Sequence, residues 1–305
     1  MNAVDVQGLT YRYGQTVALD HLDLAIPAGS IYALLGPNGS GKTTLLQLLT
    51  GLRRARKGRA TVLGVDSAAL SHRDRARIGY VAEGQSLPRW MRLEQLEAYL
   101  APLYPTWDRR LAAELRARFG LKADRKVGAL SRGDHMKAAL LCALAPRPQL
   151  LIMDEPFTGI DVAVRDDLVR GLLASAGSEG WTVLVCSHDV EEVELLADHV
   201  GFLSAGRLLL SEPADDLRQR FRRVTVLLED SSAPPDLAPE WLAVDRAGQL
   251  LSFIMPNASD DLVARTLPQR FPDARHIDVS ATSLRDVFIA MARSGAATRP
   301  TGAVA

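Results

Sequence analysis

The chain has 305 residues, and its 36 lysines and arginines balance its 36 aspartates and glutamates, so the formal net charge is zero. This length is enough for more than one domain. Because a neutral chain lacks the basic excess of a nucleic-acid-binding surface, we expect no nucleic-acid partner. Its two cysteines, Cys142 and Cys186, lie in apolar stretches, which argues against a disulfide framework or metal cluster and fits a reducing compartment.

The N-terminal part of the chain predicts a small antiparallel sheet. Apolar and polar residues alternate from Val4 to Ile26, the pattern of a hairpin with one buried face. The first residues show no basic start followed by an apolar stretch, so we expect no signal peptide. The apolar run at 31–35 then predicts a buried strand, and the run at 45–49 predicts a helix.

The segment between that strand and that helix carries a phosphate-binding pattern, G-x-x-x-x-G-K-[ST]. Its residues are Gly36, Pro37, Asn38, Gly39, Ser40, Gly41, Lys42, Thr43 and Thr44. Its glycines let backbone N–H groups point at an anion, and the helix start adds its positive end. We expect Lys42 to reach the β- and γ-phosphates of a nucleoside triphosphate and the Thr43 hydroxyl to hold Mg²⁺. The alternative is a glycine-rich turn that happens to contain a lysine.

The middle of the chain alternates between strands and helices. The predicted elements are strands at 60–63 and 78–81, helices at 93–100, 109–119 and 131–145, a strand at 150–153, a helix at 163–174 and a strand at 182–186. This alternation predicts a mainly parallel sheet covered by helices, an α/β fold.

Two acids end the predicted strand at 150–153. Asp154, at the tip of a strand beside a P-loop, is suited to hold Mg²⁺ directly or through water. Glu155 projects differently and is the candidate general base that polarises an attacking water. Because acidic turn residues often follow strands, this functional interpretation depends on the P-loop upstream.

From about residue 2 to residue 215, the chain resembles the ATP-binding subunits of ABC transporters. Besides the two motifs above, Leu-Ser-Arg-Gly-Asp at 130–134 resembles the family signature Leu-Ser-Gly-Gly-Gln, with Arg132 and Asp134 as departures. The resemblance implies that Ser131 and Gly133 cap the γ-phosphate of ATP held by a second copy. Ser131 and the first N–H groups of a helix form an anion site, although a plain helix cap has the same geometry.

Two further motifs follow in the family's order. His188, directly after the predicted strand at 182–186, resembles the switch histidine that contacts the γ-phosphate and senses hydrolysis. Asp161, in Gly-Ile-Asp at 159–161, resembles the D-loop that links the two ATP sites of a dimer. Neither a lone histidine nor a Gly-x-Asp turn carries this meaning without its place after the other motifs.

Tyr13 and Glu83 are the remaining candidate ligands. Tyr13 precedes the P-loop at about the distance where the family stacks an aromatic ring on adenine; Tyr11, two residues away on the same face, is the competing candidate. After the predicted strand at 78–81, the family usually carries a glutamine that ligates Mg²⁺. Here Glu83 takes that place, with Gln85 two residues later, and we assign the Mg²⁺ role to Glu83.

The resemblance implies an α/β P-loop NTPase core at 1–215 with an antiparallel N-terminal β subdomain and a helical subdomain at about 84–145. Exposed aromatic side chains of this subdomain are candidates to line a groove for a permease helix, or else they fill its own core. These are Trp90, Tyr99, Tyr104 and Trp107.

The character of the chain changes around Pro213. Strand-like runs at 224–228 and 250–254 and a helical run at 284–292 predict a small C-terminal α/β domain at 216–293. The last residues, 294–305, are rich in Gly, Ala, Thr and Pro and predict a disordered tail.

The implied function is that of an ATP-binding and ATP-hydrolysing subunit that powers transport, and we expect export. Its catalytic residues would be Glu155, His188 and Lys42, its cofactors ATP and Mg²⁺, and its partners a second copy of itself and a separate integral membrane permease. No apolar run approaches the roughly 20 residues that span a bilayer, so we expect a cytoplasmic protein, peripheral on the inner face of the cell membrane. The alternatives are a soluble ABC-type ATPase acting on nucleic acid or ribosomes and an ATP-dependent regulator with weak turnover.

Overall fold

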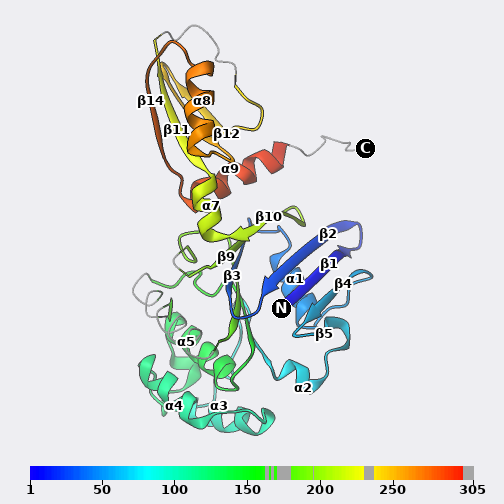
Figure 1. Cartoon of the computed structure of the whole chain (residues 1–305). Coiled ribbons are helices and arrows are strands. Elements are labelled where there is room, and N and C mark those ends of the chain that lie inside the picture. The colour runs from blue at the N-terminus through cyan, green and yellow to red at the C-terminus, as the bar shows by residue number, and fades with distance from the viewer. Residues whose placement is uncertain (162–164, 166–167, 170–179, 195, 230–236, 298–305) are drawn as a thin grey trace. The chain divides into compact units, whose positions relative to one another are not determined.

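The computed structural model of the chain describes residues 1–161, 165, 168–169, 180–194, 196–229 and 237–297. It divides into two compact units, Met1–Ser211 and Glu212–Ala305, which are described one at a time (Figure 1). This division lies slightly before the expected change at 215.

The N-terminal sheet of the first unit has the strand order β2-β1-β4-β5. Its strands are β1 (Asn2–Tyr13), β2 (Thr16–Pro27), β4 (Lys57–Val62) and β5 (Val65–Asp66). Neighbouring strands are antiparallel throughout. The hairpin predicted from the alternation between Val4 and Ile26 is therefore confirmed. It begins slightly earlier, at Asn2, and ends slightly later, at Pro27.

A second, six-stranded sheet has the order β10-β9-β3-β8-β7-β6. Its strands are β3 (Ile31–Leu35), β6 (Ile78–Val81), β7 (Leu150–Asp154), β8 (Thr182–Ser187), β9 (His199–Ser204) and β10 (Arg207–Pro213). The strands from β9 to β6 pair in parallel. Because parallel strands that are covered on both faces are apolar throughout, β3 and β7 are buried at every residue. The carboxyl ends of β3, β7 and β8 therefore meet at one edge of the sheet.

Several of the described helices of the first unit begin at a residue whose side chain caps the helix. The described helices are α1 (Lys42–Leu49), α2 (His72–Arg75), α3 (Leu93–Leu100), α4 (Arg109–Arg118) and α5 (Arg132–Leu144), with short 3₁₀ turns η1 (Ser67–Ala69), η2 (Ala101–Leu103) and η3 (Val127–Ala129). The side chains of Ser71, Asp108 and Ser131 accept hydrogen bonds from the first backbone N–H groups of α2, α4 and α5. Helices α3 and α4 both pack against α5, so these three form the helical part of the unit.

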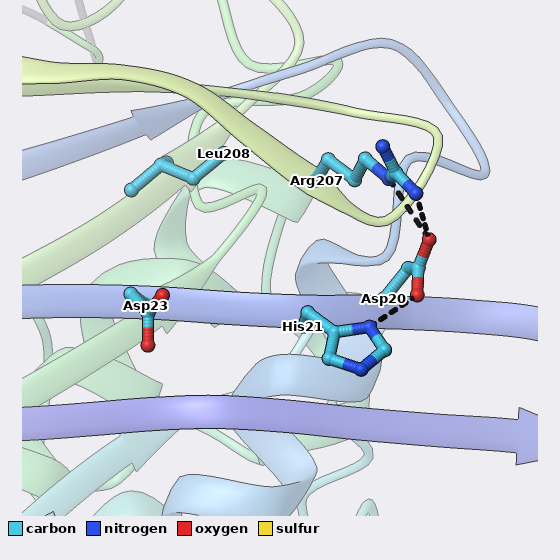
Figure 2. Close-up of a pocket in the computed structure, with 5 residues that line it drawn as sticks. All are labelled: Asp20, His21, Asp23, Arg207 and Leu208. Atoms are coloured by element: carbon cyan, nitrogen blue, oxygen red, sulfur yellow. Dashed lines mark hydrogen bonds and ion pairs between the residues drawn. The ribbon is translucent and has the colours of Figure 1, made fainter.

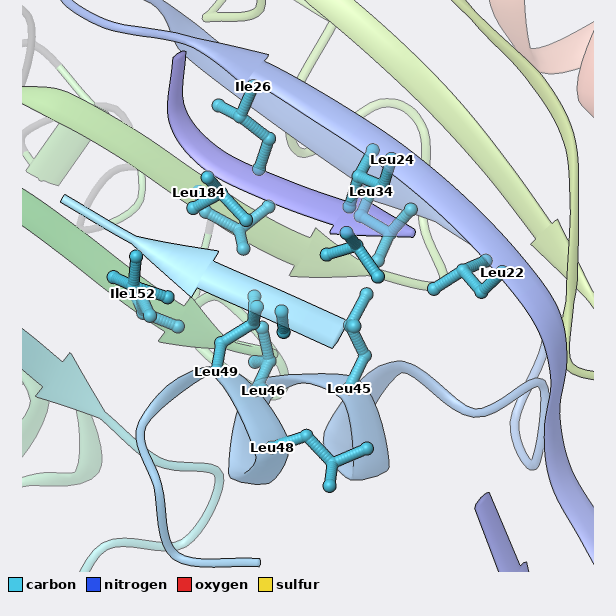
Figure 3. Packing of buried hydrophobic residues seen from close by; sticks show 14 of the residues in the cluster. Leu22, Leu24, Ile26, Leu34, Leu45, Leu46, Leu48, Leu49, Ile152 and Leu184 are labelled. Atoms are coloured by element: carbon cyan, nitrogen blue, oxygen red, sulfur yellow. The ribbon is translucent and has the colours of Figure 1, made fainter. Parts of the chain in front are cut away.

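The core of the first unit joins the two sheets through α1. Helix α1 buries four leucines in one apolar cluster with residues from strands of both sheets (Figure 3). They are Leu45, Leu46, Leu48 and Leu49. Each fully buried leucine stabilises the fold by about 2 kcal/mol relative to an exposed one. This packing fixes the start of α1, and so the loop before it, against the sheet edge.

The second unit is a four-stranded antiparallel sheet with the order β12-β13-β11-β14. Its elements are α7 (Ala214–Arg220), β11 (Arg222–Leu228), β12 (Leu242–Ala247), β13 (Leu250–Met255), α8 (Asp260–Arg270), β14 (Ala274–Ala281) and α9 (Leu284–Ala297). Its core is aromatic: the Trp241 and Phe253 rings stack with centroids 4.0 Å apart, and the Phe271 ring lies 5.8 Å from Trp241.

The structure refines several boundaries. Helix α1 begins at Lys42, earlier than the expected 45, so the P-loop lysine is already helical. Helix α9 runs to Ala297, so the expectation of disorder from residue 294 is wrong for its first residues; 298–305 lie outside the described residues. Most of the helix predicted at 163–174 also lies outside them. No described helix is both long and apolar enough to cross a membrane.

Candidate nucleotide site

The P-loop bends sharply between β3 and α1, and two of its glycines are required by close backbone contacts. A Cβ atom on Gly36 would lie 2.4 Å from the Leu203 carbonyl oxygen. Gly41 has a φ of +113° and would place a Cβ 2.5 Å from the Ala18 carbonyl oxygen. Residues that carry a Cβ atom rarely adopt that φ, so glycine is the residue that fits at this position. The loop can therefore keep its backbone close to a bound anion.

The turn between β9 and β10 is hydrogen-bonded to the P-loop. The Gly206 backbone N–H donates to the Ser40 carbonyl at 2.9 Å, and the Gly206 carbonyl accepts from Asp20 N at 2.9 Å. Arg207, the next residue, donates to Asp20 Oδ2 through Nε at 2.8 Å and Nη2 at 2.6 Å. Hydrogen bonds from His21 and then Arg207 lower the pKa of Asp20. Figure 2 shows Asp20, His21 and Arg207 lining a hollow beside β2. None of the residues that line this hollow also lines the pocket at the P-loop.

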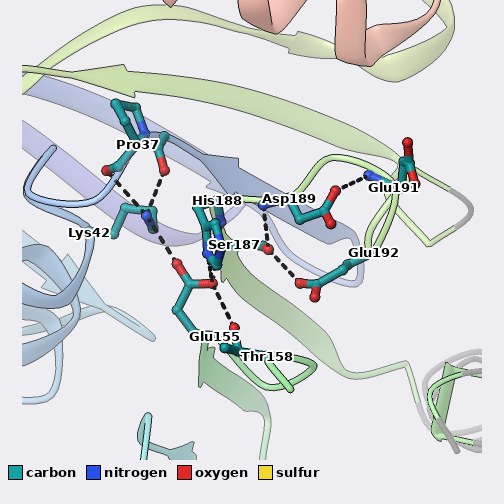
Figure 4. A network of polar contacts seen from close by, with 10 residues as sticks. Pro37, Lys42, Glu155, Thr158, Ser187, His188, Asp189, Glu191 and Glu192 are labelled. Carbon is teal, nitrogen blue, oxygen red and sulfur yellow. Dashed lines mark hydrogen bonds and ion pairs between the residues drawn. The ribbon is translucent and has the colours of Figure 1, made fainter. Parts of the chain in front are cut away.

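A network of charged and polar side chains lies at the carboxyl edge of the parallel sheet, with Lys42 and Glu155 buried and His188 41% exposed (Figure 4). Lys42 Nζ donates to the Gly36 carbonyl at 2.7 Å and lies 3.1 Å from Glu155 Oε1 in an ion pair. That oxygen has no partner in hydrogen-bond geometry, so the contact is electrostatic. Glu155 Oε2 lies 2.8 Å from His188 Nδ1 and accepts from the Thr158 hydroxyl at 3.4 Å. The three residues expected to be catalytic are thus adjacent in the fold.

Glu155 is held in an unusual backbone conformation. Its φ is +49°, in the left-handed region that non-glycine residues rarely adopt. The Glu155 N–H donates to the Cys186 carbonyl at 2.9 Å, which fixes this turn to the end of β8. Such conformations persist where surrounding contacts over-determine them, and they gather at functional sites. The turn aims the Glu155 carboxylate at Lys42, while the preceding residue ends the strand.

Asp154 lies at the end of β7 with only 1% of its surface exposed. Burial raises the pKa of Asp154, as do the nearby Glu155 and Glu83 carboxylates, while a hydrogen bond from Thr43 and the Lys42 charge lower it. Its Oδ1 atom is buried without a hydrogen-bond partner. A carboxyl oxygen without a hydrogen-bond partner, close to a threonine hydroxyl, is a suitable ligand for a hard cation.

The expected Mg²⁺ ligands are therefore near one another, although they do not form a closed metal site. Among the described residues, no group of three or more His, Cys, Asp or Glu side chains is arranged to hold a metal. A cation at Asp154 would need oxygen ligands from Thr43, water and phosphate. Gln85, the alternative to Glu83, instead accepts a hydrogen bond from the Ala82 N–H at 3.2 Å within its own turn.

A pocket of about 490 Å³ opens beside this edge. Its lining brings together most of the predicted ligands: Tyr13, Thr16, Val17, Ala18, Asn38, Gly39, Ser40, Gly41, Lys42, Thr43, Thr44, Glu83 and Glu155. Tyr13 is 42% exposed, and its hydroxyl lies 3.4 Å from Thr44 Oγ1. Tyr11, the competing aromatic residue, is not among the described residues that line the pocket.

The signature segment is not part of this lining. Ser131 caps α5 by accepting a hydrogen bond from the Asp134 N–H at 3.1 Å, and its side chain is exposed. Gly133 is half-buried in the first turn of α5, and Asp161 is exposed. Thus the structure brings the P-loop, Asp154, Glu155 and His188 together, with Asp154 and His188 beside the pocket rather than in its lining. Ser131, Gly133 and Asp161 lie outside this group.

Arg132 contacts the expected D-loop of its own chain. A Cβ atom built on Gly159 would lie 2.2 Å from Arg132 Nη1, and Gly159 has a φ of +69°. Arg132 also lines a small hollow of about 80 Å³ together with Glu83 and Glu155. The arginine that replaces the signature glycine therefore packs on Gly159 within the subunit.

The aromatic residues of the helical part divide into two groups. Trp90 and Tyr99 are 74% and 57% exposed, so the interpretation that they fill the subdomain core is wrong for these two. Tyr104 and Trp107 are half-buried with ring centroids 6.4 Å apart. Trp107 lines a hollow of about 340 Å³ with residues of α3 and α4.

Sequence reasoning missed two features of the site. Ser187 donates to Glu192 Oε2 at 2.7 Å, and burial raises the pKa of Glu192; the run of acids after His188 was a visible signal. Arg53, in the basic run after α1, stacks on the ring of Tyr13. Its spacing along the chain gives no indication of that contact.

Comparisons with known proteins assign the family. A family model described as ABC transporter matches residues 19–158. The daunorubicin resistance ATP-binding protein DrrA3 of Streptomyces coeruleorubidus is 32% identical over 301 residues, which cover 94% of this chain and 95% of that protein. The chain belongs to the ATP-binding subunits of ABC transporters. Members of this family are ATPases.

Some other relatives match about two thirds of this ABC subunit. The sulfate/thiosulfate import ATP-binding protein CysA of Yersinia pseudotuberculosis serotype I (strain IP32953) is 35% identical over 215 residues. The match covers 68% of this chain and 59% of that relative, so the chain spans somewhat more than half of CysA.

Solved structures agree with the fold. An ATP-binding subunit of an ABC transporter has a TM-score of 0.65 at 25% identity, covering 71% of this chain and 92% of that chain. A dimeric ATP-binding cassette bound to ADP and Pi has a TM-score of 0.62 at 24% identity, covering 69% and 98% of the two chains. The expected P-loop NTPase fold is confirmed.

Proposed function

We propose that this ABC subunit binds ATP with Mg²⁺ in the P-loop pocket and hydrolyses it to power export through a separate membrane permease. The observation that carries the proposal is the network in which Glu155, buried beside Asp154, contacts both the buried Lys42 and the more exposed His188. An ammonium group, a carboxylate and an imidazole lie together beside a pocket, and this grouping supports the proposed roles of a phosphate-binding cation, a general base and a charge-stabilising imidazole.

The phosphate chain would lie along the P-loop. Backbone N–H groups of the loop and the N-terminus of α1 favour anionic oxygens. Tyr13 would stack on the adenine ring from the pocket wall. Asp154, Thr43 and Glu83 would hold Mg²⁺, consistent with the buried, unpartnered Oδ1 of Asp154. The bound cation would neutralise charge that develops on the phosphate oxygens.

Nucleotide binding would rearrange the present charge network. Lys42 now pairs with Glu155, and a γ-phosphate offers it a more concentrated negative charge. Movement of Lys42 to the phosphate would free the Glu155 carboxylate to orient a water and accept its proton. As the water oxygen bonds to the γ-phosphorus, the bond from that phosphorus to the β–γ bridging oxygen would break, releasing ADP and phosphate. His188, hydrogen-bonded to Glu155, would steady the developing charge on the γ-phosphoryl group.

The site would be completed by a second copy of the chain. Ser131 and Gly133 are outside the pocket of their own subunit. Ser131 is exposed and caps the start of α5, a helix of 13 residues. Supplied by the partner, that helix start would cap the γ-phosphate, with Asp161 linking the two sites. Closure of two copies on ATP and reopening after hydrolysis would transmit work to the permease.

Two observations support the expected direction and location. DrrA3, named for drug resistance, matches nearly the whole chain, whereas CysA, named for import, matches 215 residues. Removal of a compound from the cell is the transport direction that confers resistance, so export is favoured. No described helix can cross a membrane, and the subunit would therefore act from the inner face of the cell membrane through its permease.

The test is ATP hydrolysis by the purified chain with Mg²⁺. We expect measurable turnover, and Glu155→Gln should lower kcat by about hundredfold or more while ATP affinity changes little, because a general base acts on the transition state. Glu114→Gln, on an exposed glutamate that is 56% accessible, is the matched control and should hydrolyse normally. A Glu155→Gln variant with full turnover would remove Glu155 from the proposed role. ATP binding without any turnover of the wild type, with or without membranes, would favour the regulator.

A further inference from the structure

Arg53 connects the end of the P-loop helix to the aromatic pair of the first hairpin. Its backbone N–H donates to the Gln47 carbonyl at 3.0 Å in the last turn of α1. Its Nε donates to Gln47 Oε1 at 2.5 Å, and its Nη1 donates to the Tyr11 hydroxyl at 3.1 Å. The planar guanidinium is thus held at two of its edges, which fixes the direction of its flat face.

That flat face lies over Tyr13. The guanidinium carbon is 4.8 Å from the centroid of the Tyr13 ring, within the range of a cation–π contact. Tyr11 meets Tyr13 edge to face, with centroids 5.1 Å apart and an angle of 75° between the rings. Tyr13 is therefore held by a cation on its face and an aromatic neighbour.

The open part of Tyr13 belongs to the nucleotide pocket. Tyr13 lines that pocket, and Arg53 is not among the described residues that do so. The guanidinium lies over the ring without lining the pocket, and Tyr13 remains 42% exposed. A side chain held in this way loses little rotational freedom when a planar base stacks on it.

We propose that Arg53 is a positioning residue for the nucleobase, acting through Tyr13 rather than through the phosphates. This inference rests on the proposed function, because it requires Tyr13 to stack on adenine. Stacking depends on the flat face of a base and not on its hydrogen-bonding groups, so Arg53 would strengthen binding of ATP and GTP alike. It would contribute nothing to a ligand without a base.

The test compares ATP with inorganic tripolyphosphate, both with Mg²⁺, by isothermal titration calorimetry. Arg53→Ala should raise the Kd for ATP about fivefold, the effect of about one cation–π contact, and should change the Kd for tripolyphosphate by less than about twofold. Unchanged tripolyphosphate binding also shows that the variant retains its P-loop. Arg54→Ala, on the exposed neighbouring arginine, is the matched control and should change neither constant.

A double-variant cycle shows whether Arg53 acts through Tyr13. In a Tyr13→Ala background, Arg53→Ala should have no further effect on ATP affinity. Arg53→Lys should give an intermediate loss, because an ammonium keeps the charge but cannot bond Gln47 and Tyr11 as a planar fork.

Two results would overturn the proposal: an equal loss of ATP and tripolyphosphate affinity in Arg53→Ala, or a loss that persists in full without Tyr13. A Tyr13→Ala loss that Arg53→Ala does not reproduce would also reject Arg53 and leave the stacking intact. If Tyr13→Ala itself leaves ATP affinity unchanged, the stacking in the proposed function fails, and Arg53 loses its role with it.

Discussion

Two ion pairs of nearly equal length lie in the two units of the molecule. In the first unit, Lys42 and Glu155 are 3.1 Å apart and only 6% and 7% exposed. In the second, Arg223 and Asp286 are 3.0 Å apart and 37% and 38% exposed. Because removal of one buried partner leaves an uncompensated charge, whereas water screens an exposed pair, burial rather than distance decides what each pair does.

The interiors of the two units differ in the same way. The first unit buries Lys42, Asp154 and Glu155 at the edge of its parallel sheet. Oxygens of both carboxylates lack hydrogen-bond partners there and are available to interact with a ligand. Among the described residues of the second unit, Thr282 is the one buried polar side chain, and the core is built around stacked Trp241. The comparison indicates that the buried charges of the first unit lower its stability at the site where a ligand would bind, whereas the second unit is stabilised by apolar packing.

Loss of the aromatic stack should have the largest effect on stability. Trp241→Ala removes the ring that stacks on Phe253 and should lower the free energy of unfolding of the second unit by about 3 to 5 kcal/mol. Hydrogen exchange of the amides in β11 and β13 measures this loss. ATP affinity should stay unchanged, because the pocket lies in the first unit.

The matched control for this variant is Trp90→Ala, whose ring is 74% exposed. It should change the free energy of unfolding by less than about 0.5 kcal/mol. If Trp241→Ala weakened ATP binding as strongly as it weakened the second unit, the separation drawn between the two interiors would be wrong.

Neutralising the buried Asp154 should stabilise the chain without nucleotide. Burial raises the folded-state pKa of Asp154, so the folded chain binds its proton more tightly than the unfolded chain. Stability from that proton is present at low pH and is lost as pH rises through the folded pKa. At pH 7, Asp154→Asn should therefore raise the free energy of unfolding by about 1 kcal/mol.

Urea denaturation at several pH values tests this sign. The gain should shrink as pH falls toward the usual range of aspartate, while Mg²⁺-dependent ATP binding by Asp154→Asn should be lost at every pH. A variant that is less stable than the wild type at pH 7 would contradict the view that this buried carboxylate costs stability.

The exposed pair should give the smallest effect. Arg223→Ala should lower the free energy of unfolding of the second unit by less than about 0.5 kcal/mol, because solvent screens the pair. Its small effect should diminish further at high salt. A loss of 2 kcal/mol or more, on the scale of about one buried hydrogen-bonded charge, would break the contrast with Lys42 and Glu155.

Much of the first unit could be predicted because its signals are local. Each signal lies within a short stretch of sequence: the apolar run of β3, the P-loop that follows it, and the two acids at the end of β7. Their order along the chain implies that they meet at one edge of the sheet. Spacing could not show that Lys42 pairs with Glu155, because the contact depends on the left-handed turn at Glu155. The contact of Arg53 with Tyr13 was missed because the two residues lie far apart in the sequence, one after α1 and the other at the end of β1.

The second unit was harder to predict because its signals conflict. Strand β14 is exposed at most positions and lacks an apolar alternation. Helix α8 contains Pro268, a residue that usually ends a helix, yet Ser259 caps its start. Helix α9 continues through Ser294 and Gly295, which are poor helix formers and led to the expectation of a tail.

The central claim is that this pocket is half of an ATP site completed by a second copy of the chain. Sedimentation of Glu155→Gln with and without ATP–Mg²⁺ tests it most directly. We predict monomers without nucleotide and dimers with it, and we predict that adding Ser131→Arg abolishes the dimer. Adding Ser71→Arg instead, at the N-cap of α2, is the matched control and should leave the dimer intact. ATP-bound Glu155→Gln that stays monomeric, or a dimer that Ser131→Arg does not disturb, would contradict the account.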